Sequence, residues 1–359
     1  MDTNRRWLFS LSTNVRALVA RLSAMVLLMV AVMAAPGCKD EMSNPGGSVV
    51  LYTSADQEYA ELVIDRFHSV SPEIEVRARY DTEMTKTTGL VERLLAETAN
   101  PQADIFWSSE VFLTIRLAQE GVLQPLYSDA LQDWPASMRD PDRLWYGLGA
   151  RARVIGYSTE RVTDPPASWQ DLTDPKWKGR VVMADPNYGT TRGHIAAMYT
   201  VWGPEVTAQY LNDLMANGLR IVASNSQGMR EIVAGTADLC FTDTDDVWAQ
   251  QRNGQAVDLA YPRHQDGADG GTLLIPNTVA VIAGRPESAA TRTFAEFMLS
   301  GDVERLLYES DSHNIPVLDI GIEVEDRYVV SDPLLVDYAQ VAANMPAAMT
   351  LANEILLGH

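Results

Sequence analysis

Cysteine is nearly absent from this sequence, which contains only Cys38 and Cys240. Cys38 lies beside a predicted N-terminal processing site, so we expect no intramolecular disulfide. Cys240 lies in the run Asp238-Leu-Cys-Phe-Thr. This run predicts a buried strand, so we expect an inert core thiol at this position and not a nucleophile.

Histidine is also scarce, and the common catalytic motifs are missing. Five histidines leave few groups for acid–base chemistry near neutral pH. The sequence contains no G-x-S-x-G, H-E-x-x-H, C-x-x-C or G-x-x-x-x-G-K-S/T motif. A binding protein is therefore favoured over an enzyme. Composition alone leaves open a carboxylate-based hydrolase, in which one Asp acts as the acid and another as the base.

Basic residues are in the minority, with 28 Lys and Arg against 48 Asp and Glu and a net charge of −20. A chain this acidic repels the phosphate backbone, so nucleic acid is not an expected partner. The acidity is compatible with a protein that handles cations, although many acidic proteins are merely soluble.

Long apolar runs are absent apart from residues 22–35, which follow four arginines near the N-terminus. This run is shorter than the ~20 apolar residues of a membrane-spanning helix and is typical of a secretory signal. Ala35-Pro-Gly-Cys38 follows at once and resembles a bacterial lipobox. We therefore predict a lipoprotein signal peptide over residues 1–37 and a lipid on Cys38, which would place the protein in the periplasm, anchored to a membrane. The alternative is ordinary cleavage nearby, with Cys38 discarded.

The chain that follows alternates between predicted strands and helices. Residues 38–48 come first, as a polar tether rich in Gly, Pro and Ser. Strands are then predicted at 49–53, 73–80 and 103–107, and helices near 59–67, 87–99 and 112–120. This β-α-β-α-β order predicts a parallel sheet with helices on its faces.

A second α/β region is predicted further along the chain. Its strands are expected at 180–184, 219–223 and 239–242, and its helices near 193–202, 204–216 and 226–234. Extended runs at 144–157 and 272–283 would cross between the two regions, and two more helices are predicted near 287–299 and 302–309. Two regions joined in this way predict an α/β fold of two lobes. The ligand is then expected at the carboxyl ends of the strands, in the cleft between the lobes.

Several segments carry a family resemblance when they are taken in order. They are Leu51-Tyr-Thr-Ser-Ala-Asp56, Ala103-Asp-Ile-Phe-Trp107 with Glu120-Gly-Val-Leu123, Ser168-Trp-Gln-Asp-Leu-Thr-Asp-Pro-Lys-Trp-Lys-Gly-Arg180, Arg263-His-Gln-Asp266, and Arg285-Pro-Glu-Ser-Ala-Ala290 with Phe294-Ala-Glu-Phe-Met-Leu-Ser300. The chain in this respect resembles the periplasmic solute-binding proteins of ABC importers, specifically the ferric-ion-binding branch.

The resemblance implies the two-lobed periplasmic-binding-protein fold of type II, in which each lobe is a mostly parallel sheet flanked by helices. We expect residues 49–150 with 276–320 in the N-terminal lobe, and residues 151–275 with 321–359 in the C-terminal lobe. It also implies a monomer that closes on its solute and delivers it to a membrane permease with its ATPase.

The resemblance implies a metal site, and this chain departs from the family's ligands at each of the positions that the resemblance identifies. Ferric-binding members hold iron mostly with two adjacent tyrosines, in many cases with a His and a Glu, and with an anion. Here the tyrosine positions hold Asp245 and Asp246, the His position holds Asp56, and the Glu position holds Ser109, with Glu110 next to it. Carboxylates at Asp56, Asp245 and Asp246 would suit Fe(III) or another hard metal ion such as Ca²⁺ or Mn²⁺.

Two other interpretations of the run Thr242-Asp-Thr-Asp-Asp246 stay open. Asp243, Asp245 and Asp246 could bind an organic cation, such as a polyamine or a thiamine-like compound. The nearby aromatic side chains would then add cation–π contacts; they are Trp248, Trp107 and Tyr52. The aspartates could instead cap a helix and oppose its dipole, which explains one or two of the three. For Asp56, capping and ligation are equal alternatives.

An anion site is expected beside the carboxylates, carrying a carbonate or phosphate. The resemblance implies that the loop Asn187–His194 offers Thr190, Thr191 and free amides to this anion, with help from Asn225. Arg151 would neutralise the anion, although Arg151 and Arg153 could equally form ion pairs between the lobes.

A ligand with a cationic and an anionic end, such as an aminophosphonate, would also fit this combination. No catalytic cofactor is expected. For His264 we predict a structural turn, and for Arg192 and His194 a place at the surface or at the start of a helix.

Overall fold

The computed structural model describes residues 47–81 and 87–358, which belong to one compact unit of the chain. The predicted signal peptide over residues 1–37, the predicted lipid on Cys38 and nearly all of the tether lie outside the described residues. Within the described ranges, the helices are too short or too polar to span a bilayer.

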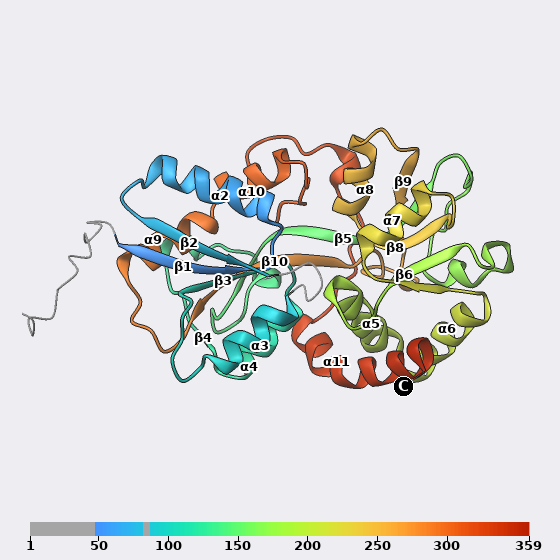
Figure 1. Cartoon of the computed structure of the whole chain (residues 1–359), viewed down its shortest axis with the longest axis horizontal. Helices are drawn as coiled ribbons and strands as arrows, with labels where there is room; N and C mark the ends of the chain where they lie inside the picture. The colour runs from blue at the N-terminus through green and yellow to red at the C-terminus, as the bar shows by residue number, and fades with distance from the viewer. Residues whose placement is uncertain (1–46, 82–86, 359) are drawn as a thin grey trace, which may run out of the picture. The chain divides into compact units, whose positions relative to one another are not determined.

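The strands join into one sheet that passes through both lobes (Figure 1). Its order is β2 (Glu75–Tyr80), β1 (Ser48–Thr53), β3 (Ile105–Ser108), β10 (Leu274–Ile282), β5 (Tyr146–Ser158), β8 (Leu239–Asp243), β6 (Val181–Ala184) and β7 (Arg220–Val222). In addition, β4 (Leu123–Gln124) pairs with β10 and β9 (Val257–Ala260) pairs with β5. The predicted α/β class is confirmed.

Parallel pairing is confined to the outer strands of each lobe. In the N-terminal lobe β1 runs parallel to β2 and β3, and in the C-terminal lobe β6 runs parallel to β7 and β8. The two long strands β5 and β10 are antiparallel to their neighbours. β5 pairs with β10 as far as Ala152 and with β8 from Arg153 onward, so a single strand carries the chain from one lobe to the other.

Helices cover both faces of the sheet in the N-terminal lobe. They are α2 (Gln57–Val70), α3 (Thr88–Ala96), α4 (Phe112–Gln119), α9 (Ala289–Met298) and α10 (Gly301–Glu309). Leu51 of β1 packs in one core cluster with Phe67 of α2 and Phe294 of α9, whose rings meet edge to face at 4.8 Å. Tyr52 of β1 points to the other face and packs with α3 and α4, as alternation along a strand requires.

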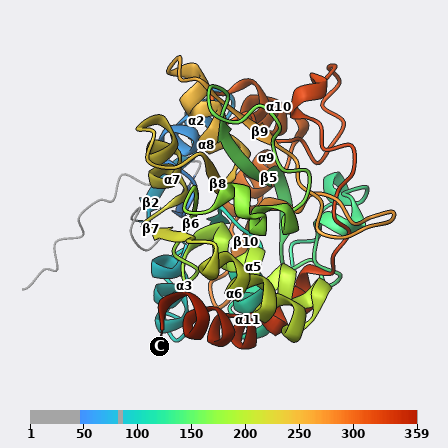
Figure 2. The ribbon, with the colours of Figure 1, turned by 90° about the vertical axis from the view of Figure 1, so that its right-hand side faces the viewer.

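In the C-terminal lobe, α7 (Asn225–Val233) and α8 (Thr244–Arg252) lie on one side of β8 and β6, and α5 (Gly189–Trp202) and α6 (Pro204–Ala216) lie on the other (Figures 1 and 2). Short 3₁₀ turns occur at Asp129–Leu131, Ala136–Met138, Gln170–Thr173, Pro175–Trp177 and Asp326–Tyr328. Cys240 is fully buried in β8, which confirms the predicted core thiol, and burial raises its pKa.

A helix near the C-terminus, α11 (Tyr338–Ala352), was not predicted from the sequence. Val341, Met345 and Ala348 enter the core cluster that also holds Phe112 of α4 and Ala196 of α5. The helix therefore packs against both lobes, and a π turn (Asn353–Leu357) ends it. Its sequence contains Pro346 and no charged residue, so it lacks the charged face by which a surface helix is recognised.

Candidate functional site

A cavity of about 410 Å³ lies where strands of both lobes end. Asp56 follows β1 and Ser109 follows β3, whereas the other lobe contributes the start of α5, the start of α7 and the end of β8. Of the residues predicted for ligand binding, this cavity brings together Asp56, Ser109, Arg151, Thr190, Thr191, Asn225, Asp243, Asp245 and Asp246. The ligand position expected from the carboxyl ends of parallel strands is therefore the position of the cavity.

Three carboxylates converge on one side of this cavity. One oxygen each from Asp243, Asp245 and Asp246 lies within 4.8 Å of the others. Asp243 precedes α8, and the other two lie in the first turn of that helix. Asp246 accepts hydrogen bonds from the hydroxyls of Ser226 and Thr242, both at 3.0 Å, so its carboxylate is held in place.

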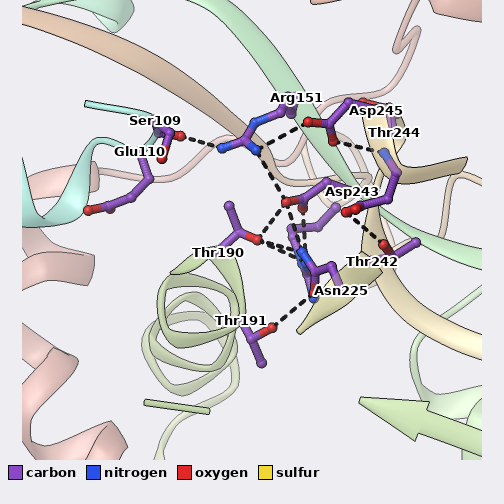
Figure 3. A network of polar contacts seen from close by, with 12 residues as sticks. Ser109, Glu110, Arg151, Thr190, Thr191, Asn225, Thr242, Asp243, Thr244 and Asp245 are labelled. Carbon is purple, nitrogen blue, oxygen red and sulfur yellow. Dashed lines mark hydrogen bonds and ion pairs between the residues drawn. The ribbon is translucent and has the colours of Figure 1, made fainter. Parts of the chain in front are cut away.

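Asp243 is the anchor of a buried polar network (Figure 3). Its carboxylate accepts from Arg153 Nη1 at 2.9 Å, from Thr190 Oγ1 at 2.6 Å and from Asn225 Nδ2 at 3.1 Å. Burial raises the pKa of Asp243, but Arg153 and then Arg151 outweigh burial and hold the pKa below its ordinary value. Thr190 and Asn225, predicted to bind an external anion, thus face a carboxylate of the protein.

Arg151 links the two lobes across the cavity. Its Nη1 lies 3.3 Å from Asp245 Oδ2 and 3.7 Å from Asp243 Oδ2, while its Nη2 donates to the backbone carbonyl of Ser109 (Figure 3). Burial disfavours the charge of Arg151, but the carboxylates of Asp245 and Asp243 outweigh burial and raise its pKa. The guanidinium is therefore a fixed positive charge in an otherwise acidic wall.

Glu110 does not line the cavity, contrary to its expected role beside Ser109. Its carboxylate points away from Arg151 (Figure 3) and accepts from the backbone N–H groups of Phe112 at 2.6 Å and Leu113 at 3.1 Å. Burial raises its pKa to about 7, although these two hydrogen bonds act in the opposite direction. Glu110 caps the first turn of α4, where an anion is favoured by the orphan amides and the helix dipole.

For His194 a place at the surface or at the start of a helix was expected; it is fully buried in α5, so the surface position is wrong. The helix α5 begins at Gly189, four residues earlier than predicted, and His194 is one of its buried residues. Its Nε2 lies 3.1 Å from Nε2 of His264, whose Nδ1 lies 2.8 Å from the carbonyl oxygen of Gly271. His264 therefore donates from Nδ1 and accepts at Nε2. The structural role predicted for His264 agrees with these contacts. Arg192 is half-buried and donates to the carbonyl of Asn187.

The aromatic side chains proposed for cation–π contacts do not line the cavity of about 410 Å³, the large cavity of the site. Tyr52 donates its hydroxyl to Glu97 at 3.1 Å, and Trp248 packs against Tyr328 and Arg327. Trp107 lines a separate cavity of about 20 Å³. An aromatic cage for an organic cation is therefore not formed by these residues.

The sequence analysis missed two tyrosines at the site. Tyr188, directly before α5, lines the large cavity, and Tyr59 of α2 lines the small one together with Asp56 and Asp245. Tyr59 follows Asp56 by three residues, which is one helical turn, so the helical spacing was the available signal. Its ring packs against the core of the N-terminal lobe, so the helical spacing of apolar residues also accounts for Tyr59 without a place at the site.

Comparisons with known proteins agree on the class of the molecule. The family model described as bacterial extracellular solute-binding protein matches residues 100–331. Iron uptake protein A1 of Synechocystis sp. is 27% identical over 283 residues, which cover 74% of this chain and 78% of that protein. A putative 2-aminoethylphosphonate-binding periplasmic protein of Salmonella typhi is 27% identical over 273 residues, covering 75% of this chain and 79% of that protein.

A solved structure shares the fold. Iron-bound HitA from Pseudomonas aeruginosa superposes with a TM-score of 0.75 at 22% identity, over 86% of this chain and 99% of that one. Since the identity is low, the superposition concerns the two-lobed architecture and not the ligand.

Proposed function

Because the chain belongs to the bacterial extracellular solute-binding proteins, we propose that it is the solute-binding component of an ABC importer and carries Fe(III) or another hard metal ion. The observation that carries the proposal is the convergence of carboxylate oxygens from Asp243, Asp245 and Asp246 at the cavity. The iron-uptake relative in Synechocystis supports it. Hard oxygen ligands match a hard cation.

Within this cluster the three aspartates have different roles. Asp243 is occupied by Arg153, Thr190 and Asn225, so it stabilises the site. Asp245 and Asp246, with Asp56 from the other lobe, are the residues that we assign to the ion. A cation held by both lobes would favour the closed state, which is the state that a permease and its ATPase would receive.

Residues 1–38 would then deliver a monomer to the periplasmic side and anchor it through Cys38. The hydrolase alternative is less well supported, because it needs one carboxyl that is protonated near neutral pH. Asp243, the most buried of the three, has its pKa lowered by two arginines.

Native mass spectrometry with elemental analysis of the purified chain tests the metal. We expect one equivalent of a hard metal ion, lost in the Asp245→Asn/Asp246→Asn variant. The variant Glu205→Ala/Asp213→Ala is the matched control, because it removes two exposed carboxylates of α6 far from the cavity. Loss of metal from both variants, or no metal uptake by the wild type, would contradict the proposal.

A second candidate is a solute with a cationic and an anionic end, such as an aminophosphonate. The observation that favours it is the buried Arg151 beside Asp245, which places both signs of charge in a cavity of about 410 Å³. The Salmonella relative supports it as well. A thermal-shift screen with 2-aminoethylphosphonate separates the two candidates, since a ligand at 100 times its Kd stabilises by ~2.7 kcal/mol.

A further inference from the structure

The strands β5 and β10 run side by side between the two lobes (Figure 1), and their pairing is interrupted beside the site. It shifts register between Pro276 and Asn277, so Gly149 of β5 is passed over and forms a bulge. Gly149 has a φ of +41°, and a Cβ there would lie 3.0 Å from Asn314 Oδ1, so both the backbone conformation and the space favour glycine. Asn277 and Asn314 also line the cavity of about 20 Å³, so the bulge borders the candidate site.

Side chains satisfy both backbone groups of this bulge. Glu304 of α10 is fully buried, and its Oε1 accepts from the N–H of Gly149 at 3.0 Å. Asn277 Nδ2 donates to the carbonyl oxygen of Gly149. The second oxygen of Glu304, Oε2, accepts from the N–H of Val317 at 3.0 Å, in the segment that pairs with β5 next to the bulge. One carboxylate therefore clamps the bulge of β5 to the segment beside it.

The surroundings of Glu304 are apolar, which makes its charge costly. The faces of α2, α9 and β5 that pack around α10 belong to one core cluster, whose titratable members are the phenols of Tyr59, Tyr80 and Tyr146. Burial raises the pKa of each of these phenols, so they stay neutral. Burial also raises the pKa of Glu304 to about 7, against the effect of its two N–H partners.

Charged or titratable groups on the same elements and beside α10 have their contacts elsewhere. They are Arg66 with Asp302, Arg292 with Glu296, Arg151 with Asp245, Arg305 with the carbonyl of Ile320, and His313 with the carbonyl of Tyr308. The protonation state of Glu304 therefore depends on burial and on the two N–H groups that it holds.

A protonated carboxyl group cannot serve both N–H groups, because the oxygen that carries the proton becomes a donor that faces another donor. The helix α10 stays packed in the core, so a proton on Glu304 favours a hinge conformation in which one of the two bonds is broken. We propose that Glu304 is a positioning residue for lobe closure. Its ionised carboxylate holds the Gly149 bulge at the angle at which both lobes line one cavity, and a proton from the solvent releases the bulge. This inference goes beyond the proposed function, because it needs no bound ligand.

Energy transfer between two dyes, one on each lobe, tests the proposal in the absence of ligand. The dyes are attached at Glu61→Cys of α2 and Glu205→Cys of α6, both exposed, in a chain with Cys38→Ser; the buried Cys240 does not react. We expect the ratio of closed to loosened chains to rise about 5- to 10-fold from about pH 6 to about pH 8. Glu304→Gln mimics the protonated acid and should remain at the low-pH value throughout.

Two further variants separate the clamp from a general effect of charge. Val317→Pro removes the N–H that Oε2 accepts and leaves the carboxylate in place, so it should also abolish the transition. Glu309→Gln, exposed in the same helix, is the matched control and should keep the wild-type profile. Circular dichroism confirms folding, and where one clamp variant does not fold the other decides. A wild-type chain without a transition, a transition that a folded clamp variant retains, or one that Glu309→Gln loses would overturn the proposal and leave the proposed ligand binding intact.

Discussion

Arg153 and Asp243 form a fully buried ion pair, with 2.9 Å between Nη1 and Oδ1. Arg153 lies in β5, the strand that runs between the lobes, and Asp243 ends β8 beside it. Thr190 and Asn225 also donate to Asp243, so the pair fixes the starts of α5 and α7 around the cavity. The network thus holds together the ends of α5, α7 and β8 that line the cavity.

Breaking this pair should destabilise the whole molecule. In Asp243→Ala the buried guanidinium of Arg153 loses its counter-ion, and we expect the free energy of unfolding to fall by about 3–5 kcal/mol. Urea denaturation followed by circular dichroism measures the loss. Asp302→Asn, which breaks the exposed pair with Arg66, is the control and should change stability little. Equal effects of the two variants would contradict the role assigned to Asp243.

The buried histidines should make stability depend on pH. Burial lowers the pKa of His264 from 6.5 to about 4, so the unfolded chain binds its proton more readily. The neutral His264 therefore contributes to the free energy of unfolding fully above pH 6.5, and this contribution is lost as the pH falls from 6.5 toward 4. The loss amounts to about 3 kcal/mol. In His264→Gln the slope of unfolding free energy against pH should change by about one proton in this range.

The pH dependence of His264→Gln must be compared with that of the wild type, because Glu304 changes the unfolding free energy with pH in the opposite direction. Burial raises the pKa of Glu304 to about 7, so its contribution favours the folded state at low pH and is lost as the pH rises from 4.5 to 7. Glu304→Gln is therefore the matched control, and it should alter the slope with the opposite sign. A slope unchanged in His264→Gln would contradict the buried neutral histidine.

The sequence predicted the architecture well because hydrophobic periodicity is a local signal. The strand predicted at 239–242 is β8, whereas the helix α8 that follows it was expected only as an alternative interpretation of the three aspartates. The same local patterns could not show that β5 exchanges partners at Arg153, since strand pairing depends on residues far apart in the chain. The helix α11 was missed because it is apolar on most sides.

Errors at the site have a common physical cause, which is the direction of side chains. Glu110 is adjacent to Ser109 in the chain, but it turns to the amides of α4 instead of the cavity. His194 was misplaced because the start of α5 was set four residues too late, a shift of one helical turn. Tyr59 carries both an apolar ring and a polar tip, and periodicity registers only the ring.

Arg151 should discriminate between the two candidate ligands. In Arg151→Gln the cavity loses a positive charge, so a hard metal ion should bind more tightly, whereas an aminophosphonate loses a charge-assisted hydrogen bond and should bind about 10- to 100-fold more weakly. Isothermal titration with ferric nitrilotriacetate and with 2-aminoethylphosphonate measures both effects. Arg230→Gln, on another wall of the cavity, is the control for net charge. Weaker binding of the metal ion in Arg151→Gln would contradict the assignment of Arg151 as a competing charge.

Variants of Glu110 and Asp56 should show which of the two carboxylates caps a helix and which binds the metal ion. Glu110→Ala removes the carboxylate that accepts from Phe112 and Leu113, so we expect a loss of about 1 kcal/mol of stability with unchanged metal affinity. Asp56→Asn should weaken metal binding and leave the stability nearly unchanged, because Asp56 lines both cavities. Its side chain makes no cap hydrogen bond to α2, so the helix has little to lose. Thermal unfolding of the metal-free chain and metal titration of each variant supply the two measurements. If Asp56→Asn lowers only the stability, the capping role of Asp56 holds and its assignment to the ion fails.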